Sequence, residues 1–107
     1  MLTHAIFARF DARPGKEDDV AQFLDQALAL AHAETTTPLW FALRLAPGSF
    51  GVFDAFANEG DRSRHLQGPI AQALMGRAEE LFVRAPSIEP IDVLGMKNVG
   101  IDGQGAV

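Results

Sequence analysis

His65 is the residue whose type and position best suit acid–base chemistry. Imidazole titrates near neutral pH, so it can transfer a proton or hydrogen-bond to a ligand. His65 follows a polar stretch, residues 58–64, and an apolar segment in which Asp54 and Phe56 share one face of an expected strand. If that face looks toward the helices, Asp54, Phe56 and His65 line one pocket. Alternatively, His65 only tethers this connection through a backbone carbonyl, which is the interpretation that spacing alone favours.

Other candidate site residues lie in the strand segments before His65. Trp40, the single tryptophan, can stack on an aromatic ligand or fill a dimer interface, and the interface is the commoner role. Arg44, four residues on along the same face, can hold an anionic substrate or pair with an acid across a dimer. Asp54 can instead form a salt bridge with Arg9 or Arg44.

No stronger catalytic or metal-binding motif accompanies these residues. The chain has no cysteine, which excludes disulfides, thiolate metal sites and cysteine nucleophiles. It contains no glycine-rich phosphate loop, no H-E-x-x-H and no G-x-S-x-G. The histidines at positions 4, 32 and 65 have no helical i, i+4 spacing, so we expect neither a metal site nor a cofactor.

The composition and net charge of the chain limit the classes of binding partner that we expect. The chain has 107 residues, 48% of them hydrophobic, with 9 Lys and Arg against 14 Asp and Glu and a net charge of −5. One globular domain fits this length, and the acidic balance disfavours nucleic acid. The sequence shows no signal peptide and no apolar run that could span a bilayer, so we expect a cytoplasmic protein without membrane contact.

Hydrophobic periodicity predicts four strands and two main helices. The strands are expected over residues 2–10, 38–46, 50–57 and 88–97. A helix opens at the acidic residues 16–19 and ends at Glu34, and a second begins at Pro69 and ends before 85–87. Between them, Asp61 is expected to cap a short helical turn that carries His65. Pro90 indicates an edge position or a bulge in the last strand.

This order predicts an α+β, ferredoxin-like β-α-β-β-α-β protomer with a four-stranded antiparallel sheet and both helices on one face. Residues 47–49 form a tight hairpin between the second and third strands, whose register stays open. The strands are apolar on both faces, so we expect the uncovered face to pair with a second copy in a homodimer. The domain is expected to cover residues 1–97, followed by a flexible tail over residues 98–107.

Four short motifs resemble the antibiotic biosynthesis monooxygenase (ABM) family over roughly residues 3–97. They are R-P-G-K-E-D-D at 13–19, F-G-V-F-D-A-F at 50–56, H-L at 65–66 and I-D-V-L at 91–94. The resemblance implies a ferredoxin-like protomer, a dimeric α/β barrel with two sheets face to face, and a pocket between each sheet and its helices.

ABM-like proteins include cofactor-independent monooxygenases that oxidise polycyclic aromatic phenols or quinols with molecular oxygen. Such a protein need only deprotonate its substrate, stabilise the anion and exclude water. The resemblance implies that His65 corresponds to the family's recurrent histidine and Asp54 to its acid in the third strand. Phe56 stands at a position that often holds tryptophan.

The sequence also departs from parts of the family. Tyrosines that bind or protonate substrate in some members have no counterpart, because the chain contains no tyrosine. Haem-degrading relatives use an asparagine in the first strand, a tryptophan in the third and a histidine ligand on the second helix. Here the first strand has no asparagine, Phe56 replaces the tryptophan and residues 68–75 contain no histidine, so haem degradation is not expected.

Two hypotheses follow. In the first, the protein is a cofactor-independent monooxygenase for a small hydroxylated aromatic or quinol, in which His65 is base or hydrogen-bond donor and Asp54 orients it. In the second, it is a non-catalytic dimer that binds a small apolar or aromatic molecule, or a stress-related protein. The residues expected to contact the ligand are Trp40, Phe41, Phe56, Arg44, Phe23 and Leu74.

Overall fold

The computed structural model describes residues 1–97 and shows the predicted α+β, ferredoxin-like fold with one additional helix. The strands are β1 (His4–Asp11), β2 (Leu39–Ala46), β3 (Ser49–Phe56) and β4 (Ser87–Asp92). The helices are α1 (Glu17–Ala33), α2 (Glu59–Leu66) and α3 (Pro69–Leu81). The expected tail, residues 98–107, lies outside the described part of the chain.

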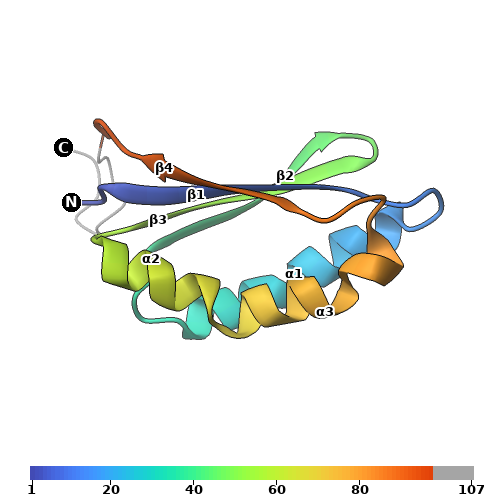
Figure 1. Cartoon of the computed structure of the whole chain (residues 1–107), viewed down its shortest axis with the longest axis horizontal. Helices are drawn as coiled ribbons and strands as arrows, with labels where there is room; N and C mark the ends of the chain where they lie inside the picture. The colour runs from blue at the N-terminus through green and yellow to red at the C-terminus, as the bar shows by residue number, and fades with distance from the viewer. Residues whose placement is uncertain (98–107) are drawn as a thin grey trace.

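The strands form one antiparallel sheet in the order β2-β3-β1-β4, and the three helices cover one face of it (Figure 1). α1 buries an apolar stripe against this face, and α3 adds a second one. The buried residues of the two helices are Val20, Phe23, Leu24, Ala27, Ala31, Ile70, Leu74 and Leu81. Among residues 1–97, no helix is long and apolar enough to cross a membrane.

The β2–β3 register decides which side chains can meet the helices. Trp40 lies opposite Asp54, and Asp54 lies opposite Ile6 of β1. Ile6 and Asp54 are buried under the helices, so Trp40 faces them as well. Phe41, the next residue, is paired with Phe53 on the opposite face. Phe41, one of the predicted ligand contacts, therefore points to the other face of the sheet from Trp40, because adjacent strand residues point to opposite faces.

The predicted strand bounds differ from the observed ones by at most two residues, except at the end of the fourth strand. The fourth strand was expected over residues 88–97 but ends at Asp92, which is paired with His4, the first residue of β1. Beyond that pair, a single backbone bond between these segments follows within residues 1–97, from the Val93 N–H to the Thr3 carbonyl. β4 is an edge strand, as Pro90 indicates.

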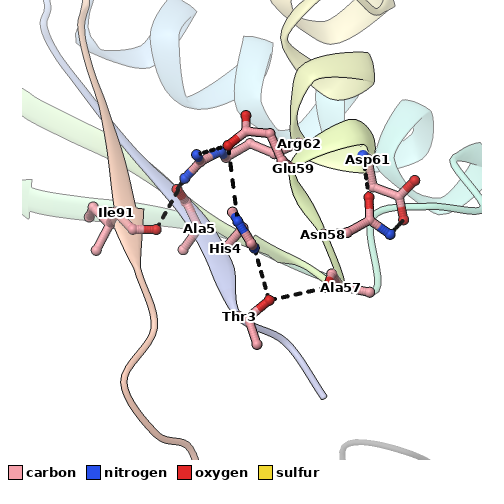
Figure 2. Close-up of polar contacts among 9 residues, drawn as sticks. All are labelled: Thr3, His4, Ala5, Ala57, Asn58, Glu59, Asp61, Arg62 and Ile91. Atoms are coloured by element: carbon pink, nitrogen blue, oxygen red, sulfur yellow. Dashed lines mark hydrogen bonds and ion pairs between the residues drawn. The ribbon is translucent and has the colours of Figure 1, made fainter.

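The helical turn before His65 is a helix of eight residues, α2, and its N-cap is Asn58 rather than Asp61. The Asn58 side chain accepts a hydrogen bond from the Asp61 backbone N–H at 2.8 Å (Figure 2). An asparagine three residues before that amide has the geometry of a standard cap, whereas Asp61 is already inside the first turn. Asn58 therefore fixes where α2 begins.

Arg62 fixes α2 to the sheet. Its guanidinium is buried and donates to the carbonyl oxygens of Ala5 in β1 and Ile91 in β4, both at 3.2 Å (Figure 2). Glu59, one turn earlier, forms an ion pair with the same guanidinium. These contacts hold α2 against the end of the sheet, and His65 lies on its last turn.

The Asn58 cap should be measurable in the stability of the fold. Asn58→Ala removes the acceptor for the Asp61 N–H, so we expect it to lower the free energy of unfolding by about 1 kcal/mol in urea titrations. Asn58→Ser keeps an acceptor at the same position and should stay close to wild type. Equal losses for the two variants would contradict the cap.

Candidate functional site

The side chain of His65 lies between two carboxylates. Its Nε2 is 2.9 Å from Oδ2 of Asp54 in β3, and its Nδ1 is 2.7 Å from Oε1 of Glu34, the residue that ends α1. Asp54 and His65 are buried, with exposed fractions of 2% and 8%. Three separate elements therefore meet in one ion-paired cluster beneath the surface.

Two further residues hold this cluster. The Thr37 hydroxyl donates to Glu34 Oε1 at 2.7 Å and lies 3.4 Å from His65 Nδ1. The ring of Phe56 is tilted against the imidazole, with 5.3 Å between ring centroids. Since Thr37 is itself buried, the position of Glu34 is fixed from the protein side and does not depend on solvent.

The geometry defines the protonation of His65. A carboxylate accepts but does not donate hydrogen bonds, so an imidazole that faces one at each nitrogen satisfies both only as a doubly protonated imidazolium. Burial lowers the pKa of His65, but the hydrogen bonds and negative charges of Asp54 and Glu34 outweigh it, and the net shift is upward. Burial raises the pKa of Asp54 by more than the bond to His65 lowers it.

The cluster borders a small cavity of about 40 Å³ between the sheet and the helices. Asp54 and His65 are its only ionisable lining residues among the described ones, and Trp40 is part of its wall. The rest of the lining is apolar and includes Phe23 and Leu74. A cavity of this size has room for water but not for an aromatic ring, since a benzene-binding cavity measures about 150 Å³.

A larger groove of about 380 Å³ lies beside this cavity, between α1 and β2. Leu24 and Trp40 belong to both linings, so they form the wall between the two spaces. Arg44 lines the groove, where its guanidinium lies 4.7 Å from the centre of the Phe50 ring and donates to the Pro47 carbonyl at 3.2 Å. Neither Asp54 nor His65 lines the groove.

Three buried side-chain atoms have no hydrogen-bond partner among residues 1–97, and all three belong to this site. They are Asp54 Oδ1, Glu34 Oε2 and Trp40 Nε1. A buried polar atom left unpaired costs about 1–3 kcal/mol, so native proteins keep few of them. Their concentration at one charged cluster beside an apolar cavity marks a candidate functional site.

The structure brings together most of the predicted residues. Asp54, His65, Trp40, Phe23 and Leu74 all line the cavity. Phe56 lies behind the imidazole, fully buried, and is not part of the lining. Phe41 and Arg44 do not reach the cavity, although both line the neighbouring groove.

Two alternative interpretations are wrong. Asp54 does not pair with Arg9 or Arg44, because its partner is His65. Arg9 is on the opposite face of the sheet, 3.9 Å from Asp11. His65 does not tether its connection through a backbone carbonyl, because its ring nitrogens contact side chains only.

Sequence reasoning missed Glu34 and Thr37. The sequence pattern identifies Glu34 only as the end of a helix, and it indicates no role in the site for Thr37. Glu34 is separated from His65 by 31 positions, so no local spacing connects them. The one available signal was an acid at the end of α1, next to the negative end of the helix dipole, where an acid is unfavourable.

Solved structures of other proteins resemble this chain, among them the following three. The NE2512 protein of unknown function from Nitrosomonas europaea is 49% identical, with a TM-score of 0.89 over 92% of this chain and 95% of that one. Rv0793 from Mycobacterium tuberculosis is 20% identical, with a TM-score of 0.79 over 90% and 99%. A protein from Deinococcus radiodurans described as a "putative antibiotic biosynthesis monooxygenase" is 18% identical, with a TM-score of 0.77 over 90% and 97%. The last two share the fold. No family model and no curated protein matches the sequence.

The cluster should make stability depend on pH. The folded-state pKa of His65 is raised from 6.5, so its contribution is complete below that pH and is lost as pH rises through the folded value. The raised pKa of Asp54 acts in the same direction at lower pH, because the folded chain again holds the extra proton. We expect the free energy of unfolding in urea to fall above pH 6.5, by up to about 1.4 kcal/mol per pH unit.

His65→Gln should remove the part of this slope above pH 6.5. His32→Gln, which changes an exposed histidine on the last turn of α1, should keep the wild-type slope and serves as the control. A His65→Gln slope equal to wild type would contradict an imidazolium held by the two carboxylates.

Proposed function

We propose that this chain, which belongs to the same family as the NE2512 protein of unknown function from Nitrosomonas europaea, is a cofactor-independent monooxygenase that oxidises a small hydroxylated aromatic or quinol with molecular oxygen. The fold shared with the "putative antibiotic biosynthesis monooxygenase" of Deinococcus radiodurans is consistent with this proposal. The observation that carries it is the buried Asp54–His65–Glu34 cluster at the wall of an apolar cavity.

The geometry favours Asp54, rather than His65, as the group that accepts the substrate proton. Both nitrogens of His65 already face carboxylates, whereas Oδ1 of Asp54 is buried without a partner among the described residues. Burial also raises the pKa of Asp54, which makes its carboxylate a stronger base than a solvated one. In this arrangement His65 positions Asp54 and balances its charge.

The proposed reaction needs only a base and a water-poor site. Asp54 takes a proton from the hydroxyl, or from the CH2 group of the keto tautomer, and leaves an electron-rich anion. The anion transfers electrons to O2 and forms a carbon–oxygen bond as a peroxide, to which the stored proton returns. Loss of water gives a carbonyl, so that one oxygen atom enters the product, the other enters water, and O2 is the sole oxidant. The largely apolar lining of the cavity disfavours bulk water beside the intermediates.

An aromatic substrate needs more room than this cavity offers. The neighbouring groove supplies it if Leu24 and Trp40, which separate the two spaces, move apart. The joined space then falls in the range of roughly 300–1,000 Å³ that is usual for small-molecule sites. The substrate ring would occupy the groove and its hydroxyl would reach Asp54.

The closed wall also supports a second candidate function. A ligand confined to the groove would contact apolar side chains but neither Asp54 nor His65. Such a protein would bind a small apolar or aromatic molecule without changing it.

We further propose that the protein forms a homodimer through the uncovered face of the sheet. Phe41, Phe53 and Phe7 follow one another across β2, β3 and β1 on that face, and Phe41 is 49% exposed. Leu43 and Ile91 extend the apolar surface on the same side. A row of three aromatic side chains favours burial against a second copy, which presents the same row.

Oxygen consumption tests the enzymatic proposal. Purified protein with a panel of anthrones and quinols should consume O2 faster than the buffer control. Asp54→Asn should lower turnover by about 100-fold, the range expected for loss of a proton-transfer group. His65→Ala should also lower turnover, because Asp54 then loses the partner that positions it. His32→Ala is the matched control and should keep the wild-type rate. Ligand binding without O2 uptake would contradict the monooxygenase and favour the binding protein.

Sedimentation equilibrium tests the dimer. Phe41→Glu places a charge at the β2 end of the phenylalanine row and should shift the protein from dimer to monomer. Met75→Glu changes a side chain of α3 that is 55% exposed on the helical side, so it should leave the dimer intact. A wild-type protein that sediments as a monomer would contradict the proposal.

A further inference from the structure

We propose that Trp40 and Asp54 form a donor–acceptor pair that recognises an uncharged hydroxyl group on an aromatic ring, with the Trp40 indole N–H donating to the oxygen whose proton Asp54 accepts. This inference rests on the proposed function, because it concerns the same cavity. It adds a hydrogen-bond donor, Trp40, and a selectivity for neutral over anionic ligands.

The sheet register places the two side chains together. Trp40 of β2 lies directly opposite Asp54 of β3, and both face the helices. Residues directly opposite each other in antiparallel strands have Cβ atoms about 5 Å apart. Both residues also line the cavity, so a small group there can contact both at once.

The free atoms of the pair are complementary. The indole nitrogen can only donate, and an ionised carboxylate can only accept. Trp40 Nε1 and Asp54 Oδ1 are both buried without a partner among the described residues, so they do not bond each other. A hydroxyl group has one donor and two acceptor positions and can satisfy both atoms at the same time.

The charge of the cluster sets the selectivity. Two carboxylates surround one imidazolium, so the site has a net charge of −1 while His65 is protonated. The charged groups nearby in α2 are already paired, Arg62 with Glu59 and Arg64 with Asp61. A ligand carboxylate would be repelled by Asp54, whereas a neutral hydroxyl would be bound.

The same donor suits the reaction. When Asp54 takes the hydroxyl proton, the negative charge moves to the substrate oxygen. The indole N–H is then the one unpaired buried donor among the described side chains, and it can stabilise that oxygen. A phenol-type hydroxyl fits better than an aliphatic one, because the ring delocalises the charge.

NMR titration under argon tests the recognition without any oxidation. The chain has one tryptophan, so the ¹⁵N-labelled protein gives a single indole N–H signal, that of Trp40. The ligands are 2-naphthol, naphthalene and 2-naphthoate, which share a ring system. We expect 2-naphthol to bind tightest, 2-naphthoate weakest, and the indole proton to move downfield only with 2-naphthol.

Two variants separate the donor from the acceptor. Trp40→Phe keeps an aromatic ring but removes the N–H, so 2-naphthol should bind about 3- to 10-fold more weakly. Naphthalene binding should change by less than about twofold, which controls for the ring packing. Asp54→Asn removes the charge and should abolish the discrimination against 2-naphthoate.

Specific outcomes would overturn the inference. Tightest binding of 2-naphthoate would indicate that Arg44 recognises an anion from the groove instead. An indole signal that 2-naphthol leaves in place would exclude Trp40 as the donor, and this result does not depend on any variant folding. O2 uptake with an unmoved indole signal would overturn this inference alone, whereas the expected binding without O2 uptake would overturn only the proposed oxidation.

Discussion

The contact of His65 with Asp54 and Glu34 is the interaction on which the arrangement of this site depends. It joins the middle of β3, the end of α1 and the last turn of α2, three elements that share no local sequence. Burying charge is costly, and an ion pair repays that cost only with good geometry and additional hydrogen bonds. Here the additional bond comes from Thr37, which fixes Glu34 on the imidazole.

The surrounding structure provides this geometry. Asn58 determines where α2 begins, and Arg62 ties the helix to carbonyl oxygens of both β1 and β4. A helix that rotated or slid by one residue would move His65 out of reach of one carboxylate, because its two bonds point in opposite directions from the ring. The polar anchoring of α2 therefore serves the site as much as the fold.

The sequence predicts the architecture well because the fold depends on local patterns. Alternating strands, the stripe of α1 and Pro69 at the start of α3 are visible in short windows, whereas the face to which Asp54 points stayed open. Glu34 could not be identified in this way, because its partner is 31 positions away. The place of Phe41 depended on the β2–β3 register, and the end of β4 depended on where β1 begins.

Side chains alternate between the two faces along each strand, so the two faces of the sheet have different roles. Trp40 and Asp54 look toward the helices and border the cavity, while their neighbours Phe41 and Phe53 form the apolar row on the other side. Aliphatic residues in place of the charged cluster would give a more stable core, since replacing buried ion pairs by well-packed apolar residues is often stabilising. A fold that keeps the cluster gives up stability at the place where a ligand can use both the free Asp54 Oδ1 and the free indole N–H of Trp40.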